Sequence, residues 1–300
     1  MKYLVNTFYI LLKALDCILS FFKKKNFLNH LFDCLYSKNT TIIQIEKKKI
    51  RFWTPGNYSK YSVENFLSKE KLVEKFISDI PDNENNIFWD IGSNLGLYSI
   101  YCASKKEKVK IVSIECSPSA VLAISKNISL NNLHDRINIF PIGLTNIANN
   151  FLLLRENRDS LGDQFNSLGE ELNLKNKKKK EANKYKIYSN TVNNILENQV
   201  LEIPSHIKLD VDGFELEVLE GFDKFLNNKK IESIIIEMKY GSRIIDGYEL
   251  DEESLEKRSD RIYDILIKSG FTSKHLSNGN QKKGWYLDCF FKSGSKKIVD

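Results

Sequence analysis

The sequence predicts an α/β fold built on a mostly parallel sheet with helices on both faces, and three observations lead to it. From residue 87 onward, strand-like apolar runs alternate with stretches of helical spacing, as expected of βαβ units. The run over 231–238 is rich in isoleucine, which is typical of a strand buried on both faces. Residues 271–276 and 285–291 are strand-like around a polar turn, which predicts a final antiparallel hairpin.

Each predicted element follows from its own residue pattern. Further strands are expected where short apolar runs recur, namely at 109–115, 137–140 and 207–211, with a short extended run at 151–154. Helical patterns lie at 97–103, 117–131, 214–226 and 250–269. Pro118 fits the first turn of one helix and Gly270 the C-cap of another. Strands and helices that alternate in this way imply right-handed crossovers.

The chain divides into three parts, of which the last carries the parallel sheet. Residues 1–45 form an N-terminal amphipathic helical extension, and residues 46–86 form a hairpin and a helix that lead into the core. Residues 87–292 form the main domain. Inside this domain, a polar stretch at 155–186 is rich in asparagine and lysine, so we expect it to be a surface insertion.

Before the sheet begins, two β-like runs at 41–45 and 49–53 flank a charged turn, which predicts a hairpin. Residues 62–80 follow, with apolar side chains spaced for one face of a single helix. Pro81 comes directly after this pattern and is expected to end the helix.

Residues 1–22 are strongly apolar, but Lys13 and Asp16 interrupt them. The uninterrupted run is shorter than the ~20 residues that span a bilayer, and no small-residue cleavage site marks a signal peptide. A helical stripe recurs at three- and four-residue steps: Leu4, Phe8, Leu11, Leu15, Ile18 and Phe22. Two interpretations stay open, a helix packed on the domain or, with the lysines at 23–25, a peripheral membrane contact through residues 1–25.

Composition limits the classes of partner and compartment. The chain has 300 residues, 42% of them hydrophobic, and a formal net charge of +6, which suits one α/β domain with a small extension. The lysines lie in local runs at 23–25, 47–49 and 175–186 and do not form a basic face interleaved with aromatic residues, so nucleic acid is not an expected partner. Five scattered cysteines without a C-x-x-C pair indicate a reducing compartment, and we expect a cytoplasmic protein without a structural zinc site.

The stretch at 88–99 reads F-W-D-I-G-S-N-L-G-L-Y-S and predicts a strand, a glycine-bearing turn and a helix. At a helix start, such a turn is expected to leave backbone N–H groups that face a ligand. The spacing Asp90-x-Gly92-x-x-x-Gly96 differs from the G-x-G-x-x-G of a dinucleotide site. An aspartate at the strand end suits a ligand with a cationic head, and the alternative is an ordinary turn whose glycines serve only the backbone.

Ligands of open α/β sheets bind beyond the carboxyl ends of the strands, so the residues at those ends are candidates. Glu115 ends the second strand, where an acid can accept both ribose hydroxyls of a bound nucleoside. Ile142, Gly143 and Leu144 follow the third strand. These three residues either flank an adenine ring or serve as turn and core.

The fourth parallel strand and its exit read H-I-K-L-D-V-D-G-F-E. Strand alternation places Lys208, Asp210 and Asp212 on one face, although charges in a buried strand need partners. Glu237 ends the neighbouring strand and is expected in the same cluster. The alternative to a catalytic cluster is a structural ion pair in which Lys208 holds Asp210. His206 could act as a base, but a lone histidine at a strand start is more often structural.

Four motifs, in this order, resemble the FkbM-type family of class I S-adenosylmethionine-dependent methyltransferases. They are D-I-G-S-N-L-G at 90–96, I-E-C-S-P at 114–118, I-K-L-D-V-D-G-F-E at 207–215 and I-I-E-M at 235–238. The resemblance implies a Rossmann-like, seven-stranded sheet, S-adenosylmethionine as the methyl donor, and O-methylation of a sugar, glycan or secondary metabolite. The chain departs from the family pattern at Asp212, where glutamate is more usual.

From this resemblance we predict which residues bind the cofactor and which carry the chemistry. The cofactor set is Asp90, Gly92, Ser93, Asn94, Gly96, Tyr98, Ser99, Glu115, Pro118, Gly143, Leu144 and Asp210. The catalytic set is Lys208, Asp210, Asp212 and Glu237, in which an acid acts as base or as metal ligand. Clustered carboxylates are compatible with a divalent metal, but no spacing demands one.

Two other functions stay open. Lys208, Asp210 and Glu237 resemble part of the Lys-Asp-Lys-Glu set of RNA ribose 2′-O-methyltransferases, but the second lysine is missing and Lys239 is only nearby. A non-catalytic nucleoside-binding module would bind S-adenosylmethionine without turnover. The expected partner is a small-molecule or glycan acceptor, and the sequence specifies no oligomeric state.

Overall fold

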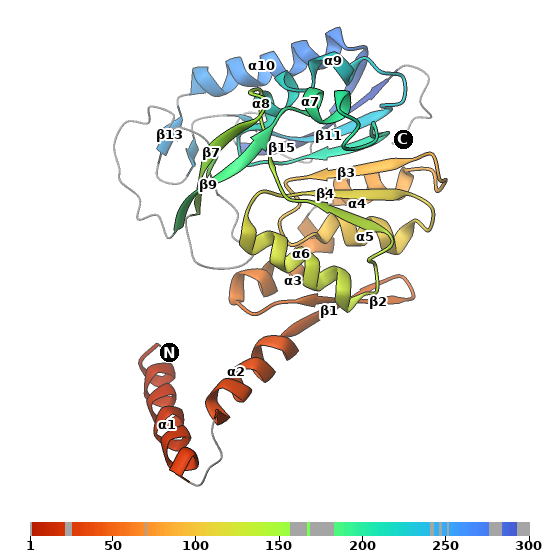
Figure 1. Cartoon of the computed structure of the whole chain (residues 1–300). Coiled ribbons are helices and arrows are strands. Elements are labelled where there is room, and N and C mark those ends of the chain that lie inside the picture. Colours follow the sequence, from red (N-terminus) through yellow and green to blue (C-terminus); the bar gives the residue numbers. More distant parts are fainter. Residues whose placement is uncertain are drawn as a thin grey trace.

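A seven-stranded sheet forms the centre of the fold (Figure 1). The computed structural model describes residues 2–21, 26–69, 71–156, 167–168, 183–240, 243–245, 248–250, 252–275 and 284–292. The strand order is β14-β15-β11-β10-β3-β4-β5. In that order the strands are Phe271–His275, Gly284–Lys292, Ser233–Tyr240, His206–Leu209, Ile87–Ile91, Lys110–Ile114 and Ile137–Phe140.

The pairing of these strands confirms the predicted, mostly parallel sheet. Strands β11, β10, β3, β4 and β5 pair in parallel with their neighbours, whereas β15 pairs antiparallel with β11 and with β14. The chain passes from β3 to β4 and β5 on one side, and later to β10 and β11 on the other. The strand order therefore reverses between β3 and β10, the position at which open α/β sheets bind ligands.

Helices cover both faces of the sheet, each over its own hydrophobic core (Figure 1). One face carries α3 (Asn57–Lys69), α4 (Lys71–Asp79), α5 (Leu97–Lys105) and α6 (Pro118–Leu130). The other face carries α7 (Val192–Glu197), α8 (Glu215–Glu220), α9 (Asp223–Leu226) and α10 (Glu252–Lys268). The predicted hairpin is confirmed as β1 (Thr40–Ile45) and β2 (Lys48–Trp53), whose Ile45, Ile50 and Phe52 join the first core.

Two single helices predicted from the sequence are each two helices in the structure. The pattern at 62–80 corresponds to α3 and α4, and α3 begins earlier because Ser59 Oγ bonds with both the N–H and the carbonyl of Gly56. The pattern at 214–226 corresponds to α8 and α9, which Gly221 separates. A Cβ at Gly221 would lie 2.1 Å from the backbone oxygen of Thr145, so only glycine permits this close packing.

Both ends of the predicted insertion are strands of a second sheet. Its order is β6-β9-β7-β8, formed by Gly143–Leu144, Asn183–Asn190, Asn150–Glu156 and Ser167–Leu168. The described ends of the stretch 155–186 are paired strands, which the sequence did not predict, and its assignment as a surface insertion stays a prediction. Its remaining parts, at 157–166 and 169–182, lie outside the described residues. The short strands β12 (Arg243–Ile245) and β13 (Tyr248–Leu250) were not predicted.

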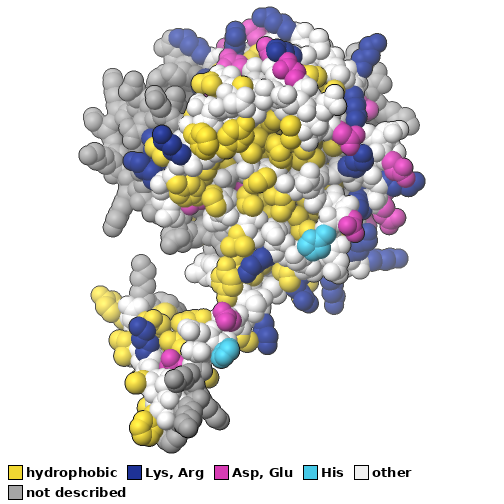
Figure 2. Space-filling view, in the orientation of Figure 1, with side chains coloured by type: hydrophobic (Ala, Val, Ile, Leu, Met, Phe, Trp, Pro, Cys, Tyr) yellow, Lys and Arg dark blue, Asp and Glu magenta, His cyan; other side chains and the backbone are white. Residues whose placement is uncertain are grey.

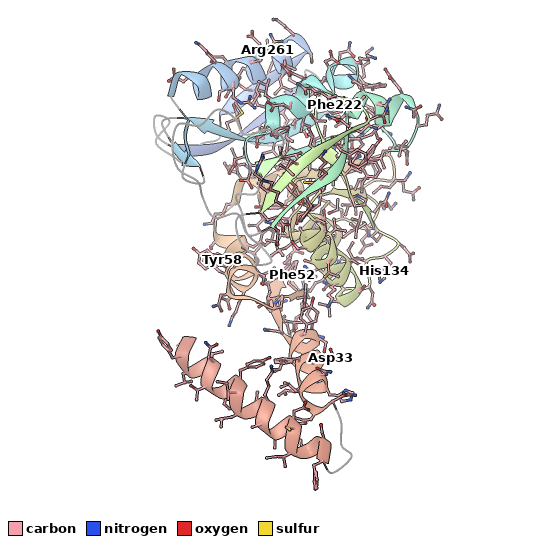
Figure 3. All side chains as sticks on the ribbon, turned by 60° about the vertical axis from the view of Figure 1, so that its left-hand side comes forward. Asp33, Phe52, Tyr58, His134, Phe222 and Arg261 are labelled. Atoms are coloured by element: carbon pink, nitrogen blue, oxygen red, sulfur yellow. The ribbon has the colours of Figure 1, made fainter. Side chains whose placement is uncertain are left out.

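The first two helices, α1 (Lys2–Phe21) and α2 (Phe27–Lys38), form an arm that projects from the domain (Figure 1). Of the two helices as described, α2 runs up to the domain near the buried Phe52, whereas α1 stands apart from it (Figure 3). Hydrophobic side chains gather on the outside of this arm (Figure 2). The interpretation of α1 as a helix packed on the domain is therefore wrong. By length and composition alone, α1 could cross a membrane.

Candidate active site

The glycine-bearing turn after β3 lies at the carboxyl edge of the sheet and is closed by the neighbouring strand. The amides of Gly92 and Ser93 both donate to the carbonyl of Ile114, at 3.0 and 3.2 Å. The amide of Asn94 donates to Glu115 Oε2 at 2.8 Å. The prediction that turn amides face a ligand is wrong for these three, because β4 and its exit supply acceptors for them. Gly96 caps α5 in the left-handed conformation, with φ +73°.

Gly92 has no room for a side chain, because a Cβ would lie 1.8 Å from the backbone oxygen of Asp210. It also has φ +74°, so Gly92→Ala is expected to lower the free energy of unfolding by about 2–3 kcal/mol. Gly270→Ala is the control, because φ is +88° there and nothing lies within 4 Å. We expect the control to cost only about 1 kcal/mol. Urea unfolding measures both, and equal losses would contradict the close packing.

Asp90 is fully buried and ties the turn to the start of α5. Its Oδ2 accepts from the amide of Ser99 at 3.0 Å and from Ser99 Oγ at 2.7 Å. Its Oδ1 lies 3.7 Å from Lys208 Nζ and has no hydrogen-bond partner among the described residues. Burial raises the pKa of Asp90, against the opposing effects of Lys208 and Ser99. These contacts are internal, and contact of Asp90 with the cofactor stays a prediction.

Lys208 connects β10 to the turn after β3. Its Nζ lies 3.1 Å from Asp210 Oδ2, donates to the carbonyl of Gly92 at 3.3 Å, and stands 4.9 Å from the ring centre of Tyr98. The side chain is buried. The ion pair that the sequence offered as an alternative, Lys208 with Asp210, is therefore present. It does not exclude a role in catalysis, because Asp210 is partly exposed at the strand end.

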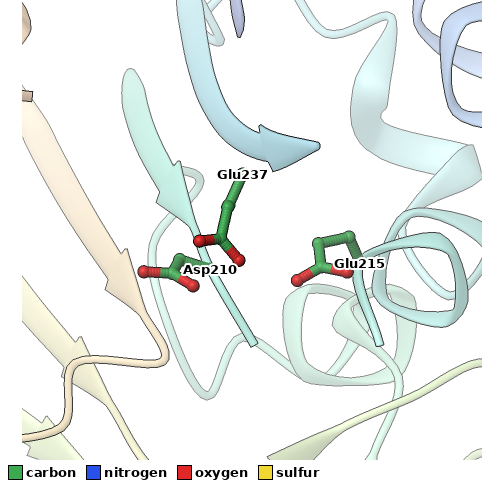
Figure 4. Close-up of side chains that lie close together, drawn as sticks. All are labelled: Asp210, Glu215 and Glu237. Carbon is green, nitrogen blue, oxygen red and sulfur yellow. The ribbon is translucent and has the colours of Figure 1, made fainter. Parts of the chain in front are cut away.

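Three carboxylates converge just beyond the end of β10, from its exit loop, from the start of α8 and from β11 (Figure 4). One carboxylate oxygen from each of Asp210, Glu215 and Glu237 lies within 4.8 Å of the others, and we call this set the acid cluster. Asp210 and Glu237 are confirmed as neighbours. The acid cluster is also the set that could hold a divalent cation, which the sequence left open.

Glu215 was missed by the sequence analysis. It is buried at the start of α8, and its Oε1 accepts from the amides of Val211 and Gly213, both at 3.1 Å. The signal was available, because an acid two residues after a turn glycine is placed to cap that turn and the following helix. Glu215 therefore fixes the loop that carries Asp210.

Asp212 is not in the acid cluster, although strand alternation predicted that it shares a face with Lys208 and Asp210. The reason is that β10 ends at Leu209, so alternation no longer applies beyond it. Asp212 lies in the exit turn with φ +55°. Its predicted contact with the acceptor stays a prediction.

Glu115 follows β4 and lies next to the glycine-bearing turn. Its Oε1 accepts from the amides of Cys116 and Ser117, both at 2.8 Å, while Oε2 accepts from Asn94. Burial raises the pKa of Glu115, and these three backbone donors oppose that rise. A carboxylate accepts about four hydrogen bonds, so its remaining capacity lies on Oε2. We therefore expect the predicted contact with the ribose to be made by Oε2.

The other predicted residues lie around this edge in different settings. Tyr98 and Ser99 are buried in α5, and Pro118 is exposed at the first position of α6. Gly143 and Leu144 form β6. Leu144 packs in the second core, so it has the core role that the sequence analysis offered as the alternative to an adenine contact. Their contact with an adenine ring stays a prediction.

His206 is structural, as the sequence favoured. It begins β10 at the amino edge of the sheet, where it is buried with Nδ1 2.8 Å from Ser233 Oγ. Burial lowers the pKa of His206 to about 4. A base at the opposite edge of the sheet cannot reach a group bound beside the acid cluster.

The chain is similar in sequence to known proteins. The family model for the methyltransferase FkbM domain matches residues 90–260. Methyltransferase sdnD of Sordaria araneosa is 29% identical over 180 residues, which cover 53% of this chain and 69% of that protein.

Two solved structures are similar at low sequence identity. A putative caffeoyl-CoA O-methyltransferase from Staphylococcus aureus has a TM-score of 0.44 and 13% identity, over 79% of this chain and 93% of that chain. A fibrillarin pre-rRNA processing protein from Methanococcus jannaschii has a TM-score of 0.43 and 17% identity, over 86% and 85% of the two chains.

Proposed function

The chain belongs to the FkbM methyltransferase domain family, and from this premise we propose that it O-methylates a sugar, a glycan or a secondary metabolite with S-adenosylmethionine as donor. Its mostly parallel, seven-stranded sheet is the class I methyltransferase fold. The observation that carries the proposal is the convergence of the acid cluster and Glu115 at one carboxyl edge, beside the glycine-bearing turn.

The charges at this edge fit a cationic donor. Lys208 pairs with two of the acids at this edge, Asp90 and Asp210, whereas Glu115, Glu215 and Glu237 add three further carboxylates. Glu115 and the turn at 92–96 would hold the nucleoside part, and Asp210 the amino acid part. When bound, S-adenosylmethionine supplies a methyl group already activated on a sulfonium sulfur, so alignment with the acceptor provides much of the rate.

A hydroxyl acceptor must lose its proton, and Glu237 is the acid we assign as the base. Asp210 is held in an ion pair by Lys208, and Glu215 is buried while it accepts two amides of the exit loop. Glu237 is partly exposed in the second half of β11, directly after the last residue that pairs with β10, and it belongs to the acid cluster. A carboxylate there accepts the proton of a hydroxyl that lies beside the methyl group.

S-adenosylhomocysteine, the expected product, provides the first test. At 100 times its Kd it should stabilise the folded protein by about 2.7 kcal/mol, visible as a rise in Tm. Incubation with S-adenosylmethionine and a panel of glycans should then add one methyl group to an acceptor, detected by mass spectrometry. Binding without any methylated product would favour the non-catalytic module instead.

Glu115→Gln is expected to weaken binding of S-adenosylhomocysteine by about 10- to 100-fold, because one charge-assisted hydrogen bond contributes about 1.5–3 kcal/mol. Titration calorimetry measures the Kd. Glu202→Gln is the matched control, since Glu202 is exposed and pairs at 2.6 Å with Lys110 at the amino end of β4. Unchanged affinity in Glu115→Gln would remove the ribose assignment.

A further inference from the structure

The apolar stripe of α1 faces away from the protein. Leu4, Phe8, Leu11 and Ile18 expose 71%, 60%, 61% and 57% of their surface. These residues, together with Leu15, are the stripe that helical spacing identified, and Phe22 lies outside the described residues. We call these five the outer stripe. An amphipathic helix of a globular domain normally buries such a stripe, so we expect the outer stripe to be buried against a partner.

A different side of α1 contacts the rest of the protein. Leu12, Asp16, Leu19 and Ser20 are the partly buried positions of α1. Asp16 Oδ1 accepts from the amide of Leu28 at 2.9 Å, which caps the first turn of α2. The antiparallel α2 thus covers the side of α1 that carries its only acid, and the outer stripe remains outward.

The helix α2 contacts the domain at Tyr36. Trp53 Nε1 donates to the carbonyl of Tyr36 at 2.6 Å, and the two rings meet edge to face at 4.6 Å. Lys126 Nζ lies 4.0 Å from the ring of Tyr36 and 4.1 Å from that of Trp53. This anchor holds α1 clear of the domain, with the outer stripe accessible (Figures 2 and 3).

We propose that α1 binds the surface of an anionic lipid membrane, lying in the plane of the membrane with the outer stripe among the acyl chains. The length and apolar composition of the helix suit a lipid environment. Residues 1–25 carry five lysines and a single acid, and that acid already caps α2. Anionic headgroups complement this charge.

The same features disfavour the other two arrangements. A helix that spans the membrane would place Lys13 and Asp16 within the hydrocarbon, although Asp16 also bonds to α2. A dimer through the outer stripe would pair two segments that each carry five lysines and a single acid within residues 1–25. The proposal is independent of the methyltransferase reaction and stands whatever the acceptor is.

Vesicle sedimentation of the full chain tests the proposal. With phosphatidylcholine vesicles that contain phosphatidylglycerol, the wild type should pellet, and high salt or pure phosphatidylcholine should weaken the binding at least severalfold. The double variant Phe8→Glu, Leu11→Glu should lose at least 10-fold in partitioning. Ile147→Glu is the matched control, because it adds the same kind of charge at an exposed apolar site on the domain.

Tryptophan placed singly at Leu4, Leu11 or Ile18 reports the depth of each position, through quenching by lipids brominated at different depths. A helix in the plane gives three equal depths, whereas a spanning helix gives steps of ~10 Å at 1.5 Å per residue. Three outcomes would each overturn the proposal. The three tryptophans could lie at graded depths, the wild type could stay in the supernatant with anionic vesicles, or the protein could form a dimer in solution that the double variant abolishes.

Discussion

Replacing Lys208 with methionine is expected to lower the free energy of unfolding by about 3–5 kcal/mol, the usual cost of leaving a buried charge without its partner. Lys208 Nζ is buried among the carbonyl of Gly92 and the carboxylates of Asp90 and Asp210. Methionine keeps the length of the chain but supplies no donor, so Asp90 Oδ1 would face an apolar group. Urea unfolding at pH 7 measures the loss.

Two further variants distinguish the loss of charge pairing from the loss of packing. In the background of Asp90→Asn, Lys208→Met should lower the free energy of unfolding by clearly less, because no buried carboxylate is then left without its partner. Lys224→Met is the matched control, since Lys224 pairs at 2.7 Å with Glu197 on the exposed surface, and we expect a change of at most about 1 kcal/mol. Equal losses in the wild-type and Asp90→Asn backgrounds would show that the lysine acts only through packing.

The pH dependence of the same variant has a definite sign. Burial already raises the pKa of Asp90 above its ordinary value of 3.8, and loss of Lys208 removes an influence that lowers it. An acid with a raised folded-state pKa takes up its proton first in the folded protein, so acidification stabilises it relative to the unfolded chain. The stability gap between variant and wild type should therefore shrink as the pH falls from 7 towards 4.

The sheet could be predicted from the sequence because each parallel strand is marked by a short, largely apolar run. Such runs at β3, β4, β10 and β11 fix which residues end each strand, and parallel pairing then brings those ends to one edge. For this reason Asp210 and Glu237 were identified as neighbours before any geometry was known.

The details of the site depend on where a strand stops, which the pattern does not mark. The alternation that correctly paired Lys208 with Asp210 fails two residues later, because the chain turns through a positive φ at Asp212. Glu215 then occupies the place assigned to Asp212. Likewise, the turn amides looked unpaired from local sequence, but their acceptors, Ile114 and Glu115, belong to the neighbouring strand and its exit.

The N-terminal arm shows a different limit. The spacing of α1 correctly indicated an amphipathic helix, since its two sides have different surroundings. Periodicity defines the sides of a helix but not what covers each of them. The short helix α2 lies within the helical extension predicted for 1–45, but the sequence analysis gave it no bounds of its own.

Glu237→Gln is expected to reduce kcat by about 10²–10⁴-fold, the range in which a general base contributes. The amide keeps the size of the side chain but cannot accept the proton of the acceptor hydroxyl. The Kd of S-adenosylhomocysteine should be unchanged, because Glu237 is assigned to the acceptor and not to the cofactor. Methyl transfer to the acceptor identified by mass spectrometry, measured at saturating donor, gives kcat.

Glu232→Gln is the matched control, because Glu232 directly precedes β11 and so lies at the opposite edge of the sheet. Full activity in Glu237→Gln would mean that another group takes the proton. If EDTA abolishes the activity of the wild type and Mg²⁺ restores it, the acid cluster is instead a set of metal ligands. A base needs only Glu237, whereas a metal site also needs Asp210 and Glu215, so Glu215→Gln should lower metal affinity only in the second case.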